Sequence, residues 1–415
     1  MSVSTESDMW GLNLGAYLSV SAESDAYKAG GDENRPPHTI SRFIRSQHAR
    51  SLWITARSVV HRLRSSWHHS RIISYLVCMD MQTKTQQRLN ALLQWFYARR
   101  CLASPTAPKD RRALQRRVRS GSVVMPYKGH YIGAEEWNKL SYAERIIWSL
   151  RSVCRRYQGI VLCGPSAAAV HGFTTSLKTQ RYVHIAVSKR SQAGRHGFIF
   201  AHYYKDPPPT CEIDGMLVTD AMQTMMDCGR TLDFVNAFEI CSMGLRKCGF
   251  ANKALQGFVG RKRRLWGIIR ARFVAECADP LCENGGEAVA VATIIELGYK
   301  QPQTQVTFTS PLDGREIRGD FCWERDDGSL VVGELDGRRK YTDPAMTNGA
   351  EISEVIMREK DRESELNMLQ IPVVRFQMEH VRKREPLRQR LEASRIPHDS
   401  NVWRSPFAGF RCVAY

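Results

Sequence analysis

The chain has 415 residues, of which 43% are hydrophobic and 25% are charged, a composition that fits a folded protein with two or three domains. Its net charge of +18 argues for a polyanionic partner, and DNA is favoured over an anionic membrane because no apolar run approaches the ~20 residues that span a bilayer. The 12 cysteines include no Cys-x-x-Cys pair, which argues against a disulfide framework or a structural zinc site and predicts a cytoplasmic location.

Residues 1–81 are predicted to be a disordered or loosely helical extension. Ser, Glu, Asp and Gly dominate its first part, and a run rich in Arg and His without steady periodicity follows. Glu6 and Asp8 stand where a secretory signal carries basic residues, so no signal peptide is expected. Because Met79 and Met81 directly precede the first patterned helix, one interpretation of the preceding segment is a translated upstream extension.

Residues 82–135 are predicted to form a winged-helix DNA-binding domain. Apolar side chains recur at helical spacing from Leu89 to Phe96, residues 111–119 predict a second, arginine-rich helix, and residues 123–132 predict a short hairpin. A basic helix in the major groove with a wing on the phosphates suits DNA, whereas a solvated basic face is the alternative. The predicted DNA contacts are Arg112, Arg116, Arg117, Arg119 and Lys128.

Several motifs over roughly residues 84–255 resemble AbiEi-family antitoxins of bacterial type IV toxin–antitoxin systems. The motifs are the Arg-Ser-Gly-x-Val turn that begins at Arg119, the segment 128–131, the stretch 164–173 with Ser-Ala-Ala-x-x-His-Gly, the strand 183–187, and the segments 214–219 and 224–227. The resemblance implies a winged helix followed by a mixed α/β antitoxin domain, here residues 136–255. It also implies a cognate toxin as a second partner.

A basic linker helix is predicted over residues 256–275. Four consecutive cations from Arg261 to Arg264 precede apolar side chains at helical spacing, which end at Phe273. Such a helix either tracks phosphates or serves as an exposed connector, and the pattern does not separate the two.

An acidic hairpin is the most distinctive chemical feature of the C-terminal region. Two apolar runs of strand length flank an Asp-Gly turn signal, and alternation puts Glu334 and Asp336 on one face of the second strand. Asp320 on the first strand is expected across from them. Three buried carboxylates need a compensating cation, and Mg²⁺ or Mn²⁺ is the natural one. A surface hairpin with solvated acids, or a purely structural role for these carboxylates, is the alternative.

Two predicted helices carry an acid on an apolar face. Glu287 shares a face with valine and isoleucine in the helix that ends at Leu297, and Glu359 lies in the helix before the last strand, with Lys360 and Arg362 beside it. Charges at such positions either pair or serve a site. For Glu359, pairing with Arg362 within the helix is the alternative.

The order of these elements resembles the PD-(D/E)XK nuclease fold: a helix with Glu287, strands bearing Asp320 and Glu334, a helix and a final strand. The segment 318–341, the helix with Glu359 and the closing Val-Val-Arg-Phe strand are similar, more narrowly, to the very-short-patch-repair-like endonuclease domain. This second resemblance covers residues 276–385.

The resemblance implies metal-dependent cleavage of a phosphodiester. Asp320 and Glu334 would hold the metal, Asp336 would assist, and Glu287 would orient a ligand or a metal-bound water. Asp336 replaces the lysine usual in the superfamily, and Lys340 replaces a histidine frequent in the narrower family, so the general base is open. The implied catalytic set is Glu287, Asp320, Glu334, Asp336 and Lys340. Arg338 and Arg339 are predicted nucleic-acid contacts, and Glu359, Lys360 and Arg362 are predicted supporting residues.

The sequence therefore predicts an α+β and α/β multidomain protein. It would combine a winged helix, a mixed α/β middle domain, a restriction-endonuclease-like mixed sheet flanked by helices, and a tail over residues 386–415. The expected function is that of a DNA-binding protein with an endonuclease domain that uses Mg²⁺ or Mn²⁺. The alternative is a non-enzymatic antitoxin or transcriptional repressor with a degenerate nuclease domain.

Overall fold

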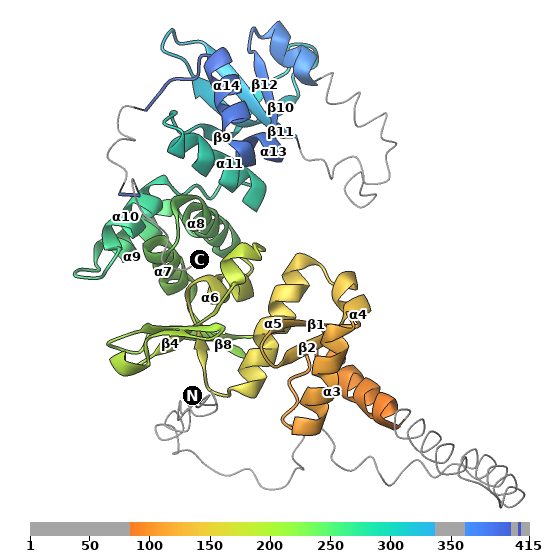
Figure 1. Ribbon diagram of the computed structural model, residues 1–415. Helices are drawn as coiled ribbons and strands as arrows, with labels where there is room; N and C mark the ends of the chain where they lie inside the picture. Colours follow the sequence, from red (N-terminus) through yellow and green to blue (C-terminus); the bar gives the residue numbers. More distant parts are fainter. Residues whose placement is uncertain (1–83, 337–361, 400–405, 408–415) are drawn as a thin grey trace, which may run out of the picture. The chain divides into compact units, whose positions relative to one another are not determined.

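The computed structural model describes residues 84–336, 362–399 and 406–407 (Figure 1). The chain divides into two compact units, residues 1–159 and residues 160–415. Both units combine helices with strands, so the predicted α+β multidomain class is confirmed at this level. Among the described residues, no helix is long and apolar enough to cross a membrane.

Unit 1 contains an antiparallel hairpin and the helices predicted before it. Residues 84–97 are helical, and α3 (Pro108–Arg119) follows. Strand β1 (Val123–Tyr127) pairs with β2 (His130–Gly133). Gly129 turns the chain between them at φ +84°, a left-handed conformation that glycine adopts without strain. The two predicted helices and the hairpin are confirmed as elements.

Unit 1 continues past residue 136, where the sequence predicts a domain boundary. Two more helices follow the hairpin: α4 (Ala134–Lys139) and α5 (Tyr142–Arg156). A capping box starts α5, because the Ser141 side chain accepts from the backbone N–H of Glu144 while the Glu144 carboxylate accepts from the backbone N–H of Ser141. Ile132 of β2 and Trp148 of α5 belong to one apolar cluster. These helices and the hairpin therefore share a core.

Unit 2 begins with a mixed sheet in the order β5-β6-β4-β3-β8-β7. Strand β4 is buried along its whole length, including His184 within its otherwise apolar sequence. The strands are β3 (Val161–Leu162), β4 (Val183–Val187), β5 (Gly194–His196), β6 (Ile199–Tyr203), β7 (Thr210–Ile213) and β8 (Met216–Thr219). The helices of this part are α6 (Gly164–His171), α7 (Ala221–Thr231) and α8 (Phe234–Cys248).

The predicted basic linker helix over residues 256–275 is wrong. Two helices, α9 (Asn252–Gly260) and α10 (Ile268–Cys277), flank a loop that contains the basic run. Gly267 adopts φ +74°, and a Cβ there would lie 2.4 Å from the carbonyl oxygen of Arg230. Only glycine fits this turn, which directly precedes α10, and residues 261–267 form a loop where amphipathic spacing alone suggested a continuous helix.

The C-terminal part of unit 2 contains the predicted acidic hairpin. Its sheet has the order β12-β11-β10-β9, in which β9, β10 and β11 are antiparallel neighbours and β12 is parallel to β11. Residues 362–368 are helical and precede β12. The bounds are α11 (Gly285–Glu296), β9 (Gln303–Thr309), β10 (Glu316–Glu324), β11 (Leu330–Asp336) and β12 (Val373–Gln377).

One apolar core joins this sheet to the middle helices. Phe238 of α8, Ala288 of α11 and Phe321 of β10 are all fully buried in the same cluster, and α8 packs along α11. The segments predicted as separate domains on either side of residues 256–275 are therefore joined by a common core.

The segment predicted as a tail, residues 386–415, is structured where it is described. It includes most of α14 (Glu385–Ala393), which follows α13 (Met378–Lys383), and both Leu387 and Leu391 are fully buried. The prediction of a tail is therefore wrong for this helix. The physical reason is the i,i+4 spacing of these leucines, which places both on one face against the core.

Candidate functional site

The acidic hairpin brings Asp320 and Glu334 to the same level of the sheet. Strands β10 and β11 pair with Phe321 opposite Gly333, so the residue before Phe321 and the residue after Gly333 are neighbours. The backbone N–H of Leu335 donates to Oδ2 of Asp320 at 3.0 Å. The predicted approach of Asp320 to the acids on the second strand is therefore confirmed.

Two arginines bracket the Glu334 carboxylate. Nη2 of Arg362 lies 2.7 Å from Oε1 of Glu334, and Nη2 of Arg375 lies 3.2 Å from Oε2. Arg375 stands opposite Glu334 in the parallel pairing of β12 with β11. The Arg375 guanidinium also lies 3.2 Å from Glu363 and 3.9 Å from Asp336. The hairpin acids thus belong to a network of carboxylates and arginines.

Burial and charge act in opposite directions on Glu334, whose side chain is only 5% exposed. Burial, the largest effect, raises the pKa of Glu334 above its ordinary value. Arg362 and Arg375 lower this pKa, and the neighbouring Asp320 raises it. The result is a carboxyl group that holds a proton at higher pH than an exposed glutamate does, a common property of functional acids.

Glu287 is anchored at the start of α11. Its Oε2 accepts from the backbone N–H of Glu283 at 2.7 Å and from Nε2 of Gln305 at 3.2 Å, and its Oε1 accepts from Nδ2 of Asn284 at 2.6 Å. Burial raises the pKa of Glu287, the Glu283 N–H lowers it, and Asp320 raises it. These hydrogen bonds explain an acid on an apolar face, because the side chain closes the first turn of the helix.

The carboxylates suit a hard cation in their chemistry but do not surround one. Asp320 and Glu334 supply the oxygen donors that Mg²⁺ and Mn²⁺ prefer. Within the described ranges, however, no group of three or more His, Cys, Asp or Glu side chains is arranged to hold a metal ion. Both oxygens of Glu334 face arginines instead. The described residues therefore do not fit the predicted metal site as they are placed.

Several predicted site residues cannot be compared with this geometry. Arg338, Arg339, Lys340, Glu359 and Lys360 lie outside the described residues. Their roles stay predictions.

Sequence reasoning missed Arg375 and Gln305. A cation between the apolar residues Val374 and Phe376 of strand β12 is the signal that could have identified Arg375. Gln305 lies on β9 between Thr304 and Val306, which pair with Phe321 and Gly319 of β10. It has a backbone φ of +56° and bonds to Glu287. Nothing in the local sequence indicates this left-handed glutamine, and such positions cluster at functional sites.

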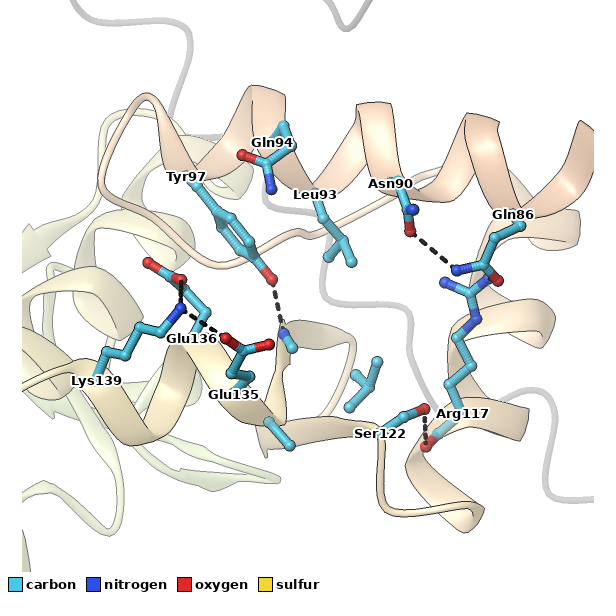
Figure 2. Close-up of a pocket in the computed structure, with 13 residues that line it drawn as sticks. Gln86, Asn90, Leu93, Gln94, Tyr97, Arg117, Ser122, Glu135, Glu136 and Lys139 are labelled. Atoms are coloured by element: carbon cyan, nitrogen blue, oxygen red, sulfur yellow. Dashed lines mark hydrogen bonds and ion pairs between the residues drawn. The ribbon is translucent and has the colours of Figure 1, made fainter.

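Unit 1 carries the second predicted set of site residues. The exposed members of this set are Arg112, Arg116, Arg119 and Lys128. Arg117 instead points toward the helix 84–97 and contacts Oε1 of Gln86 (Figure 2). Of the four arginines predicted to contact DNA from α3, three are therefore exposed. The fourth, Arg117, packs between the two helices.

The groove beside Arg117 is polar and carries both signs of charge (Figure 2). The Tyr97 hydroxyl accepts from the backbone N–H of Gly133 at 2.7 Å, and Nζ of Lys139 lies 2.8 Å from Glu135. Acidic side chains at its edge make the groove a poor fit for a polyanion. The exposed face of α3, and not this groove, is the candidate DNA surface of unit 1.

No protein-family model, curated protein or solved structure matches this chain. The resemblances to the antitoxin and nuclease families therefore depend on the motifs alone. The functions that they imply stay predictions.

Replacing Arg112, Arg116 and Arg119 together with alanine is expected to weaken duplex DNA binding and its salt dependence. Each lost phosphate contact lowers the slope of log K against log salt by about 0.9, so the triple variant should lose about 2.7. Fluorescence anisotropy of a labelled duplex at several salt concentrations measures both quantities. Arg117→Ala is the matched control and should keep the wild-type slope; a triple variant with that slope would rule out this surface.

Proposed function

We propose that this chain is a nucleic-acid-binding protein whose C-terminal part is a nuclease-like domain that acts on phosphodiester bonds. The observation that carries the proposal is the order α11, β9, β10, β11, helix 362–368 and β12, with Asp320 and Glu334 side by side on the central strands. This is the order of elements, and the placement of acids, on which the resemblance to PD-(D/E)XK nucleases depends. The net charge of +18 supports a polyanionic substrate.

The arginines beside the acids support the same substrate class. Arg362 and Arg375 present planar guanidinium groups, which bind phosphate oxygens as readily as carboxylates. A phosphodiester held by these arginines would lie next to Glu334. Because burial raises its pKa, Glu334 is our candidate for the group that takes a proton from the attacking water.

A non-enzymatic nucleic-acid-binding regulator is the second candidate. The observation that favours it is the engagement of both Glu334 oxygens by arginines. An acid held in two ion pairs can serve the fold and the binding of phosphate without any chemistry. The two candidates therefore differ in whether Asp320 and Glu334 are needed for cleavage.

The discriminating experiment is cleavage of supercoiled plasmid with Mg²⁺, with Mn²⁺ and with EDTA. We expect the wild type to nick or linearise the plasmid, and Asp320→Ala and Glu334→Gln to leave it intact. The EDTA arm shows whether cleavage needs a divalent cation. Asp327→Asn is the matched control, because Asp327 is an exposed acid in the turn of the same hairpin. This variant should cut like the wild type.

A second readout separates metal binding from catalysis. A cation that binds the folded chain raises its melting temperature, so melting the wild type and Asp320→Ala with and without Mg²⁺ or Mn²⁺ shows whether Asp320 contributes to metal binding. Intact plasmid with the wild type, or equal cutting by the two site variants, would favour the regulator. In that case DNA binding is retained and the thermal shift with metal is absent.

A further inference from the structure

The loop between α9 and α10 combines exposed apolar side chains with a dense positive charge. Trp266 is 58% exposed and Ile269 is 67% exposed. Immediately before them, Arg261, Arg263 and Arg264 are also exposed, and no acidic residue occurs between Phe258 and Ala275. Large exposed apolar groups are uncommon in such a polar setting and indicate a contact surface. The charge indicates a polyanion.

The loop is held in one conformation by the rest of unit 2. Nε of Arg230 donates to the carbonyl oxygen of Trp266 at 2.8 Å, and Nη2 of Arg272 donates to the carbonyl oxygen of Lys262 at 2.8 Å. Arg230 is itself held by the buried Asp227, whose Oδ1 lies 3.0 Å from Nη1. Anchors at both ends make this a preorganised surface, which lowers the entropic cost of binding.

The Trp266 ring has a fixed cationic support. The guanidinium of Arg270, which is 6% exposed, lies 4.5 Å from the centroid of the ring. A cation–π contact of this kind orients the ring while more than half of the residue stays accessible. A groove of about 410 Å³, lined by residues 265–270 and Pro406, lies along the same loop.

We infer that this loop binds an unpaired strand of nucleic acid, with a base stacked on Trp266 and the phosphates beside Arg261, Arg263 and Arg264. An aromatic platform flanked by cations is the recurrent solution for single strands, because every unpaired base offers a stacking face. Paired bases are stacked within a duplex and cannot use the platform. An anionic membrane is less well matched, because it needs a broader apolar face than the few exposed side chains here. The site is separate from the nuclease-like sheet.

The test compares a fluorescent single strand of about 20 nucleotides with its duplex, by anisotropy in EDTA so that no cleavage occurs. Trp266→Ala is expected to weaken single-strand binding about 5- to 150-fold and to leave duplex binding unchanged, since one stacked base contributes about 1 to 3 kcal/mol. Trp266→Phe keeps an aromatic ring and should retain most of the affinity. Replacing Arg263 and Arg264 with glutamine should reduce the salt slope by about 1.4.

Leu312→Ala is the matched control for loss of apolar surface, because Leu312 is also 67% exposed and lies outside this loop. Circular dichroism melts check that each variant is folded. The inference is overturned if Trp266→Ala binds the single strand like the wild type, or loses single strand and duplex equally. It is also overturned if Leu312→Ala matches Trp266→Ala, or if phosphatidylserine vesicles and not the single strand require Trp266. None of these results depends on plasmid cleavage, so this inference and the proposed function can fail separately.

Discussion

Replacing Arg375 with leucine is expected to lower the free energy of unfolding by about 3 kcal/mol. The variant leaves Glu334, 5% exposed, with only one of its two arginines, and it also removes the cation near Asp336 and Glu363. Breaking a buried ion pair costs about 3 to 5 kcal/mol, and the lower end applies because Arg362 remains and Arg375 is itself 29% exposed. Urea unfolding followed by circular dichroism measures the change.

The triple variant Glu334→Leu/Arg362→Leu/Arg375→Leu, which replaces the acid and both arginines, distinguishes an ion-pair effect from a packing effect. It should recover most of the lost stability, because a buried pair replaced by apolar side chains is close to neutral. Arg388→Leu serves as the control, since its ion pairs with Glu385 and Glu392 are exposed to solvent and should contribute little to stability. If Arg375→Leu and Arg388→Leu cost the same, the network around Glu334 does not stabilise the fold as described.

Glu239→Gln is expected to make the chain more stable at alkaline pH and to change its pH dependence. Glu239 lies on α8, is 8% exposed, and accepts one hydrogen bond from Oγ1 of Thr174 at 3.2 Å. Burial raises the pKa of Glu239 from 4.5 to about 7. A folded-state pKa above the unfolded value means that the folded chain binds more protons, so this group's stabilisation is full below pH 4.5 and is lost as the pH rises through 7.

The loss amounts to about 2.5 kcal/mol between pH 5 and pH 8, since the pKa of Glu239 is about 7 in the folded chain against 4.5 in the unfolded chain. Unfolding in urea at several pH values, for wild type and Glu239→Gln, gives the difference between the two curves. The buried His184 and His202, whose pKa values burial lowers to about 3 and about 4, act with the opposite sign in both proteins and cancel in this difference. The prediction would be contradicted if the free energies of unfolding of wild type and Glu239→Gln changed in parallel with pH. It would also be contradicted if the exposed Glu212→Gln gave the same change in pH dependence.

Local pattern was enough to predict much of the fold. Apolar spacing predicted the helix that now spans residues 84–97, and alternation with an Asp-Gly turn predicted the hairpin of β10 and β11. The same alternation predicted that Asp320 would meet Glu334. These predictions succeed because helix and strand periodicity, and turn residues, act over a few neighbouring positions.

Other features could not be predicted because they depend on segments that meet only after folding. Residue 267 in the loop between α9 and α10 must be glycine because the backbone at Arg230 leaves no room for a side chain there. The sequence gives no reason to separate Arg117 from its neighbours on α3. In the structure, Arg117 contacts Gln86 of the helix 84–97 and is not among the exposed arginines. Leu387 and Leu391 lie in the segment predicted as a tail, although both are buried in the core of unit 2.

The sequence by itself determined the acids, their alternation along the hairpin and the positive charge of the chain. Only the tertiary structure decided what those acids face. Pairing of β12 beside β11 places Arg375 opposite Glu334, a contact between residues far apart in the chain that no local pattern encodes. A charged residue on a buried strand needs a partner. Which residue becomes that partner depends on which strands lie side by side in the folded chain.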